Sequence, residues 1–330
     1  MKVFIIGGTG FLGYHAVHAL LAAGHCVATL SKPPLPARDL FPPEVNISLG
    51  DFNALEDRQI ISLFSGCDAL VFAAGVDDRV VPRAPAYPFF YEGNVLTTDR
   101  AIRLAREAGV RKAVVFSSYF LECDKRWPEL CLSDVHPYIR SRKEQAEACL
   151  RAAGDDLGVS FLLLPYIFGS MPGRPPLWKP LLKYLDSALP VVFYPEGGSA
   201  MVSVDEVAQA TVAALERGEP GAMYPVGAED LTWREWIGRL LKLMGKHKPV
   251  LTLPKWMVKL GAWCVHTLHK LRGLESGLNL VPFVELQTRL AYLDGNHTRE
   301  VLGYLGAPLQ DALEATVTAS LEPKTPTKDK

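Results

Sequence analysis

Short apolar runs alternate with helical patterns along the first half of the chain. Six runs rich in β-branched and aromatic residues predict strands at 3–6, 26–30, 45–49, 69–73, 113–116 and 160–164. Apolar residues at helical spacing predict helices at 11–23, 58–64, 95–108 and 138–153. Glycines follow three of these helices, at Gly24, Gly109 and Gly154, where a left-handed residue commonly ends a helix. Because strand and helix alternate, the fold class is α/β, with a doubly wound parallel sheet.

The regular alternation ends after Pro165. Four prolines, at 172, 175, 176 and 180, interrupt the pattern, and helical periodicity returns only at 202–217 and 233–244. We therefore expect a first domain at 1–165, to which 201–220 returns. A smaller C-terminal substrate-binding lobe would comprise 166–200 and 221–320. The polar residues 321–330 are expected to form a disordered tail.

Composition and charge exclude several classes of protein. With 48% hydrophobic and 22% charged residues, the 330-residue chain can bury a large core and is not disordered as a whole. Lys and Arg number 35 against 36 Asp and Glu, so nucleic acid is not expected as the main partner. The cysteines form no C-x-x-C pair and have no histidines at zinc-ligand spacing, which predicts reduced thiols and no metal site. They lie at 26, 67, 123, 131, 149 and 264.

No segment has the pattern of a signal peptide or a membrane span. The apolar run 3–6 is too short for a signal-peptide core, and no window approaches the roughly 18 apolar residues of a spanning helix. We therefore expect a cytoplasmic protein. Residues 246–272 carry six cations and no acid, with Trp256 and Trp263 among them. This pattern is typical of a helix on an anionic membrane surface, but a helix covering the lobe's pocket with a solvated basic edge explains it more simply.

The clearest chemical signal is a glycine-rich turn between the first strand and the first helix. Its sequence is Gly7-Gly8-Thr9-Gly10-Phe11-Leu12-Gly13. This spacing lets the chain turn tightly, lets backbone N–H groups approach a pyrophosphate, and packs the helix against the sheet. The strand–turn–helix context favours dinucleotide binding over a merely tight turn. We expect Gly7, Gly10, Phe11, Leu12 and Gly13 at the cofactor.

Several later stretches extend this signal in order along the chain. They are Gly50-Asp51, Ala73-Ala74-Gly75, Asn94-Val95, Ser117-Ser118, Pro165-Tyr166-Ile167-Phe168-Gly169 and Val204-Asp205-Glu206-Val207-Ala208. Together with the G-x-x-G-x-x-G turn, they resemble the extended short-chain dehydrogenase/reductase superfamily, the NAD-dependent epimerase/dehydratase group, over residues 1–320. The resemblance implies a Rossmann-type sheet. It also implies cofactor-site positions at Asp51, Ala73, Ala74, Asn94 and Pro165, with Asp51 near the adenine and Asn94 in a structural role.

The end of the second predicted strand bears on the choice of nicotinamide cofactor. An acid there would bind the ribose hydroxyls and favour NAD, but this chain has Ser31 followed by Lys32. A hydroxyl and a cation suit a 2′-phosphate better, and Arg38 is a possible second cation. The alternative is that Lys32 is only a solvated loop residue. NADP is therefore the preferred cofactor, with NAD as the alternative.

The resemblance also implies a catalytic tyrosine, with a lysine four residues later on the same helix face. Tyr138 matches the tyrosine, but Arg142 occupies the lysine position and Lys143 comes one residue later. A phenol has a pKa near about 10, so a cation must stabilise its anion. Either Arg142 supplies that charge, or a bulge near the helix start brings Lys143 to the tyrosine and the cofactor ribose. Lys143 is narrowly preferred, because it keeps the family's spacing to Glu147.

The resemblance further implies a hydroxyl that orients the substrate oxygen. Ser118 is the first choice and Ser117 the second. The family often has a third hydroxyl residue where this chain has Tyr119, whose ring either packs or faces the pocket.

These features predict an NAD(P)-dependent oxidoreductase that interconverts a ketone and a secondary alcohol on a mid-sized, partly hydrophobic molecule. A nucleotide-sugar epimerase or dehydratase is the alternative within enzymes. The displaced lysine motivates another alternative, a non-catalytic dinucleotide-binding sensor or assembly subunit. The expected partner is a small-molecule substrate, and the resemblance suggests a homodimer through helices of the cofactor domain.

Overall fold

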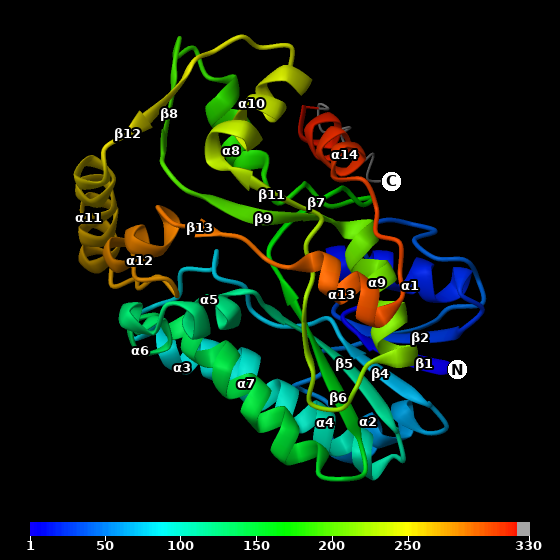
Figure 1. Ribbon diagram of the computed structural model, residues 1–330. Helices are drawn as coiled ribbons and strands as arrows, with labels where there is room; N and C mark the ends of the chain where they lie inside the picture. The colour runs from blue at the N-terminus through cyan, green and yellow to red at the C-terminus, as the bar shows by residue number, and fades with distance from the viewer. Residues whose placement is uncertain (322–330) are drawn as a thin grey trace.

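A seven-stranded parallel sheet forms the centre of the protein, as the computed structural model of residues 1–321 shows (Figure 1). Its strand order is β10-β6-β5-β4-β1-β2-β3. The strands are β1 (Lys2–Ile6), β2 (Cys26–Ser31), β3 (Asn46–Leu49), β4 (Ala69–Phe72), β5 (Lys112–Ser118), β6 (Gly158–Leu164) and β10 (Met223–Pro225). From β1, the chain first adds β2 and β3 on one side and then β4, β5 and β6 on the other, so the direction of winding reverses between β1 and β4. Ligands of doubly wound sheets bind at such a point, outside the carboxyl ends of the strands.

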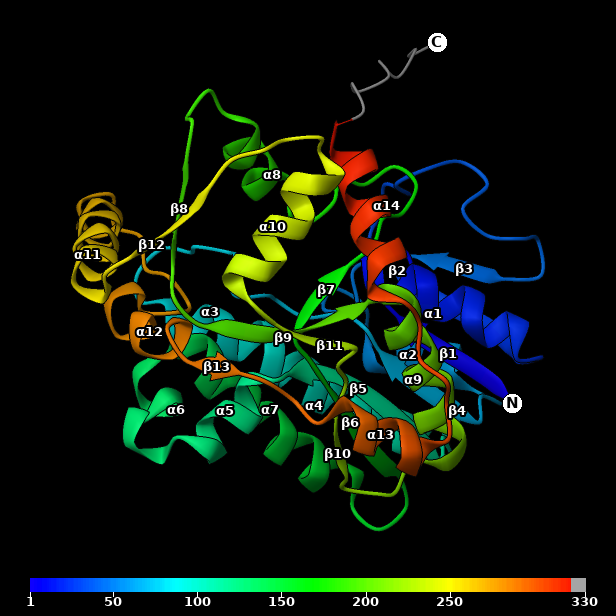
Figure 2. The ribbon, with the colours of Figure 1, turned by 45° about the horizontal axis from the view of Figure 1, so that its top comes forward.

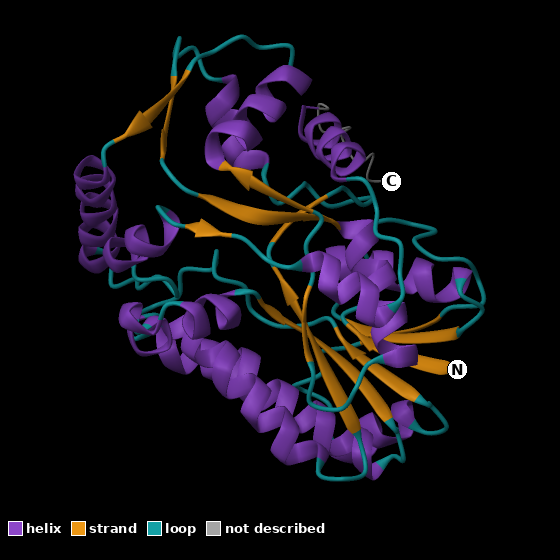
Figure 3. Ribbon diagram, viewed as in Figure 1, coloured by secondary structure: helices purple, strands orange, loops and turns teal. Residues whose placement is uncertain are grey.

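Helices cover both faces of this sheet (Figure 3). One face carries α1 (Phe11–Ala22) and α9 (Val204–Arg217), which pack against each other. The other face carries α2 (Asp57–Phe64), α4 (Thr97–Glu107) and α7 (Pro137–Ala153). Each side has its own buried apolar cluster, so the inner strands are apolar almost throughout. The predicted α/β class and doubly wound sheet are confirmed.

A second lobe lies beyond the carboxyl ends of the strands (Figure 2). In it, β9 pairs with β7, β11 and β13, and β8 pairs with β12. The bounds are β7 (Tyr166–Phe168), β8 (Val192–Pro195), β9 (Gly198–Ser203), β11 (Glu229–Thr232), β12 (Val250–Leu253), β13 (Leu290–Ala291), α8 (Lys179–Asp186), α10 (Trp233–Leu243) and α14 (Leu309–Leu321). Trp236 is fully buried at the centre of the lobe's apolar cluster.

Shorter elements complete the described chain. They are α3 (Ala86–Phe90), a π-helical turn (Tyr91–Leu96), α5 (Phe120–Arg126), a 3-10 turn (Pro128–Leu130), α6 (Leu132–Val135), α11 (Lys255–Leu271), α12 (Leu280–Gln287) and α13 (Gly295–Leu302). α11 and α12 pack against each other at one edge of the molecule (Figure 1).

Two assignments differ from those expected, and a third falls mostly outside the described residues. The helix predicted at 95–108 begins earlier, at α3, and passes through the π-helical turn before α4. Within 221–320, assigned to the lobe, β10 joins the main sheet beside β6; it has only three residues and ends in proline, so it gives no alternation signal. The tail expected at 321–330 lies outside the described residues except for Leu321, which ends α14.

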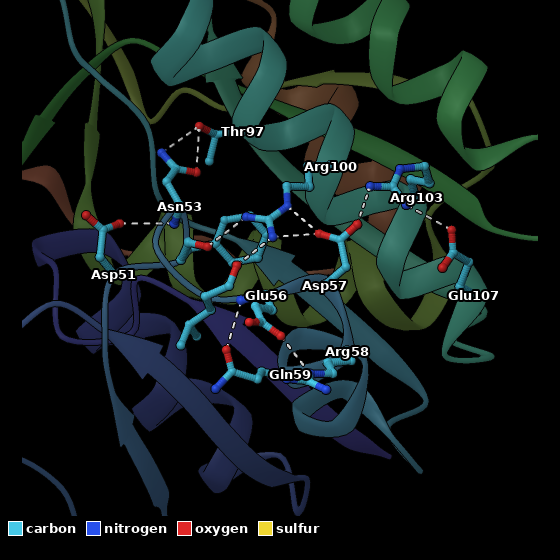
Figure 4. A network of polar contacts seen from close by, with 12 residues as sticks. Asp51, Asn53, Glu56, Asp57, Arg58, Gln59, Thr97, Arg100, Arg103 and Glu107 are labelled. Atoms are coloured by element: carbon cyan, nitrogen blue, oxygen red, sulfur yellow. Dashed lines mark hydrogen bonds and ion pairs between the residues drawn. The ribbon is translucent and has the colours of Figure 1, made fainter.

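The loop after β3 is held against α4 by Arg100 (Figure 4). Its Nε donates to an Asp57 carboxylate oxygen at 2.7 Å. Its two terminal nitrogens donate to the backbone carbonyls of Phe52 at 3.0 Å and Leu55 at 2.6 Å. The guanidinium also lies 5.4 Å from the centre of the Phe52 ring. Arg100 therefore fixes the backbone that follows Asp51.

We expect Arg100→Ala to lower the midpoint of thermal unfolding by about 5 °C, because it leaves two carbonyls without their charged donor. Arg103→Ala is the matched control, because Arg103 makes only side-chain ion pairs, to Asp57 and Glu107, and is itself partly exposed. Its effect should stay within about 1 °C. Calorimetry of both variants measures the difference, and equal midpoints would contradict the anchoring role.

Candidate active site

The glycine turn lies where β1 meets α1. Gly7 has a φ of +90°, and a Cβ there would lie 3.2 Å from the backbone of Ala73 at the end of β4. A Cβ at Gly13 would lie 2.2 Å from the Gly7 carbonyl oxygen. Side chains at either position are therefore excluded, and the turn stays open at the N-terminus of α1. Such an N-terminus attracts a phosphate through its free N–H groups and helix dipole.

The buried side chain of Ser31 stabilises the glycine turn. Its Oγ accepts a hydrogen bond from the Thr9 amide at 3.2 Å, and the side chain is buried. The hydroxyl expected to meet a 2′-phosphate is thus engaged inside the protein. Lys32 is exposed, and its Nζ lies 2.9 Å from an Asp51 carboxylate oxygen. This ion pair lowers the pKa of Asp51.

A cavity of about 690 Å³ extends from the glycine turn into the second lobe. Its volume lies within the range of small-molecule sites. Of the sequence-predicted residues, it brings together Phe11, Leu12, Ala73, Ala74, Ser117, Ser118, Tyr138, Arg142 and Pro165. Much of the remaining wall is aromatic or aliphatic, including Phe116, Phe120, Tyr166, Met171, Leu177, Trp178 and Phe283. A partly apolar ligand would fit this wall.

Tyr138 and Arg142 meet in this cavity. Both project from α7, one helical turn apart, and both are buried. The Arg142 Nε donates a hydrogen bond to the Tyr138 hydroxyl at 3.1 Å. Burial raises the pKa of the Tyr138 phenol, while the Arg142 charge lowers it. The remaining Arg142 donors bond to the Gln145 side chain and to the carbonyls of Phe116 and Val76, which fixes the guanidinium in place.

Lys143 points elsewhere. Its Nζ lies 3.2 Å from Asp124 and 3.3 Å from the Ser133 hydroxyl, and about half of its side chain is exposed. The helix α7 runs from Pro137 to Ala153 without the bulge that would have turned Lys143 toward Tyr138. One residue of helix corresponds to a rotation of about 100°, which places Lys143 off the productive face. The structure therefore brings Arg142 to the tyrosine, against the narrow sequence preference for Lys143.

The two candidate serines end β5. Ser118 Oγ accepts from the Phe120 amide at 3.3 Å, and its hydroxyl helps to lower the pKa of Tyr138. The Ser117 hydroxyl is buried and has no hydrogen-bond partner among residues 1–321. Tyr119 is also buried and lines the cavity, with its hydroxyl 3.4 Å from Ser199 Oγ. Of the two serines, Ser118 is therefore the one whose hydroxyl acts on Tyr138.

Asn94 is fully buried and does not line the cavity. Its amide oxygen accepts from the Val76 amide at 2.8 Å, and its amide nitrogen donates to Ser141 Oγ at 3.1 Å. It therefore joins the loop after β4 to α7. This arrangement matches the structural role that the resemblance implies.

Sequence reasoning missed the acidic loop after β4. Asp77, Asp78 and Arg79 all line the cavity, and Asp77 forms an ion pair with Arg79. Burial raises the pKa of the Asp78 carboxyl, and the nearby Asp77 charge raises it further. The available signal was the position of Asp77, Asp78 and Arg79, two to four residues after Gly75.

A segment of the second lobe supports the start of α7. The Tyr138 amide donates to the Gly277 carbonyl at 2.9 Å, and the Asn279 amide donates to His136 Nδ1 at 3.0 Å. Burial lowers the pKa of His136 to about 4, which keeps its ring neutral and able to accept. A Cβ at Gly277 would lie 2.4 Å from the Phe90 ring and 3.0 Å from the Tyr138 Cβ. Only glycine fits there.

Known proteins match this chain in sequence. Residues 7–160 match the family described as NAD(P)H-binding. The 3-diazoavenalumate denitrifying reductase of a Streptomyces species is 27% identical over 289 residues, which cover 83% of this chain and 91% of that protein. The 4-hydroxy-2-methyl-3-oxo-4-farnesyl-3,4-dihydroquinoline-1-oxide ketoreductase of Stigmatella aurantiaca is 25% identical, over 93% of this chain and 92% of that protein.

Solved structures share the whole fold. The UDP-glucuronic acid 4-epimerase from Bacillus cereus, in complex with NAD, has a TM-score of 0.68 and is 15% identical to this chain. The match covers 97% of this chain and 98% of that one. The common architecture thus includes both the cofactor domain and the second lobe.

Proposed function

We propose that this chain, whose residues 7–160 match an NAD(P)H-binding family, is an extended short-chain dehydrogenase/reductase that interconverts a ketone and a secondary alcohol. The observation that carries this proposal is the hydrogen bond from Arg142 to the Tyr138 hydroxyl, inside the cavity that begins at the glycine turn. A buried phenol with a fixed cation beside it is suited to pass a proton to or from a substrate oxygen.

The residues around the glycine turn fit a nicotinamide dinucleotide. The backbone of Ala73 and Ala74 leaves no room for a side chain at Gly7, and the helix N-terminus offers N–H groups to a pyrophosphate. When bound, the reduced cofactor supplies the hydride to the carbonyl carbon. Tyr138 gives its hydroxyl proton to the carbonyl oxygen, which completes the alcohol. Arg142 stabilises the phenolate that remains until it takes a proton from solvent, and Ser118 orients the substrate oxygen.

The cavity wall supports a partly apolar ketone over a sugar nucleotide. Phe116, Phe120, Trp178 and Phe283 offer apolar area. Of the three arginines in the wall, Arg79 pairs with Asp77 and Arg142 bonds to Tyr138, which leaves Arg174 for an anionic group, whereas a diphosphate calls for several cations. The name of the Stigmatella relative, a ketoreductase with a farnesyl-bearing substrate, favours the same class. The Arg142–Tyr138 contact also argues against the non-catalytic alternative, since it replaces the displaced lysine.

Oxidation of NADPH in the presence of a panel of cyclic and aryl ketones tests this proposal. In a separate arm, UDP-glucose is incubated with the protein and NAD, and its epimer is separated by chromatography. We expect turnover of apolar ketones and none of UDP-glucose. Epimerisation of UDP-glucose without ketone reduction would contradict the proposal.

We further propose a preference for NADPH that rests on Lys32 and not on Ser31. Lys32 is exposed next to Asp51 at the carboxyl end of β2, where a 2′-phosphate would pair with its charge. Lys32→Ala should weaken NADPH binding about tenfold and leave NADH binding unchanged, since a charged hydrogen bond is lost only with the phosphate. Fluorescence titration with both cofactors measures this change.

Arg38→Ala is the matched control for a cation in the same proline-rich loop. A larger loss of NADPH affinity in this variant would transfer the role to Arg38. Equal affinity of the wild-type protein for NADH and NADPH would overturn the preference itself.

A further inference from the structure

The helix α11 is exposed along its whole length. None of its 17 residues is buried, although the helix is rich in apolar side chains. Trp256 is 66% exposed, Trp263 56% and Leu271 80%. The helix lies at the edge of the molecule in both views, far from the glycine turn (Figures 1 and 2). Contiguous apolar surface of this kind marks an interaction site more often than chance exposure.

The four most exposed apolar residues of α11 share one face, while the less exposed Met257, Val265 and Leu268 lie outside it. Trp256, Leu260, Trp263 and Leu271 are spaced at i, i+4, i+7 and i+15, which on a helix confines them to a sector of about 80°. Leu260 is 54% exposed. The resulting stripe is about 22 Å long, from the rise of 1.5 Å per residue. We call these four residues the α11 stripe.

The charges of α11 have one sign. Its sequence contains three lysines and two histidines and no acidic residue. Lys255 and Lys259 form ion pairs with Glu285 of α12, on the side that faces the protein. Lys270 and Arg272 are exposed at the C-terminal end, beside Leu271. A tryptophan-bearing stripe with cations at its edge complements an anionic lipid surface.

The length of α11 determines how it would meet a bilayer. No helix within residues 1–321 is long and apolar enough to cross a membrane. We propose that the α11 stripe is a binding site for anionic phospholipid, with the helix lying in the plane of the membrane surface. A second copy of the chain is a less suitable occupant, because two α11 helices would bring cations of the same sign together.

The position of α11 also relates this surface to the cavity. α11 packs on α12, and Phe283 of α12 lines the cavity wall, whereas no residue of α11 does so. The interpretation of 246–272 as a cover over the pocket is therefore not supported, since α12 lies between. If α11 lies on a membrane, only α12 separates the lipid from the cavity. Apolar molecules dissolved in the membrane would then be close to the cavity.

Sedimentation with lipid vesicles tests the proposal on the full-length protein. We expect binding to vesicles of phosphatidylglycerol and phosphatidylcholine, and little binding to phosphatidylcholine alone. Added salt should weaken the binding, because part of the attraction is electrostatic. Tryptophan emission should shift to shorter wavelength on binding, since Trp256 and Trp263 would leave water.

Two leucine substitutions provide a matched pair. Leu271→Ser should lower the affinity for anionic vesicles about tenfold, because it removes apolar area of the α11 stripe that the lipid would bury. Leu305→Ser replaces a leucine that is 98% exposed between α13 and α14, on a different part of the surface, and should leave binding unchanged. NADPH titration of each variant verifies that it is folded. Vesicle binding is measured without any ketone substrate, so its failure would not bear on the proposed ketone reduction, and a failure of ketone reduction would not bear on vesicle binding.

Three results would overturn the proposal. The first is the absence of binding to anionic vesicles by the wild-type protein. The second is equal binding by the Leu271→Ser and wild-type proteins. The third is self-association that Leu271→Ser abolishes while vesicle binding is absent, measured by analytical ultracentrifugation, which would assign the stripe to a second copy of the chain.

Discussion

Tyr138→Phe is expected to lower kcat for ketone reduction by at least about a hundredfold, because it removes the proton donor while leaving the ring in place. Phe90 and Phe120 pack edge-on against that ring, so phenylalanine fits the same space. NADPH affinity should stay within about twofold of wild type, since the hydroxyl is directed to Arg142. Steady-state kinetics together with a cofactor titration separate the two effects. A variant as active as wild type would remove Tyr138 from the mechanism.

The pH profile gives a second test of Tyr138. Burial raises the pKa of this phenol above its ordinary value, so in the ligand-free protein it is protonated at neutral pH. Ketone reduction needs the protonated form and should be insensitive to this group from neutral pH up to its pKa. Alcohol oxidation needs the phenolate and should rise about tenfold per pH unit below that pKa. Tyr138→Phe should lose this rise.

The second large effect is expected at Arg142. Arg142→Met should lower kcat about a hundredfold and move the oxidation profile to higher pH, because the charge that lowers the pKa of Tyr138 is lost. Lys143→Met is the matched control from the adjacent helix position. Lys143 bonds to Asp124 and Ser133 on the protein surface, so its loss should change kcat by less than about threefold.

Arg142→Met also leaves the carbonyls of Phe116 and Val76 without a donor, so its fold must be verified by NADPH binding. Arg142→Lys keeps the charge but not the planar group, and it should restore part of the activity and the position of the pH profile. If Lys143→Met loses activity while Arg142→Met retains it, Lys143 is the positioning cation and the present assignment is wrong.

The sequence allowed the sheet and the glycine turn to be predicted because both depend on local patterns. Alternating apolar runs and helical periodicity specify the βαβ units, and Gly7 and Gly13 stand where side chains are excluded. The position of β10 could not be predicted in this way. Its three residues pair with β6 through contacts between distant parts of the chain, and no local periodicity marks them.

The choice between Arg142 and Lys143 needed the register of α7. A single bulge would have exchanged their positions, and spacing alone does not exclude a bulge. Ser31 illustrates a similar limit, since its burial under Thr9 depends on the packing of the turn. Asp78 enters the site from a loop whose path is set by Asn94, a residue far along the chain. At these positions the residue type indicated which chemistry is available. Which side chain faces the cavity depends on packing between distant segments, which the sequence pattern does not show.

Gly277 has a consequence for engineering this protein. Its carbonyl accepts the amide of Tyr138, and the Phe90 ring and Tyr138 Cβ leave no room for a side chain there. At Gly277 the second lobe therefore holds Tyr138 through its backbone. A chimera that takes this lobe from a relative must bring a glycine and the same chain path to that point, or the start of α7 will be displaced. The lobes are thus not interchangeable modules, and transplants should be cut so that residues 136–138 and 277–279 come from one parent.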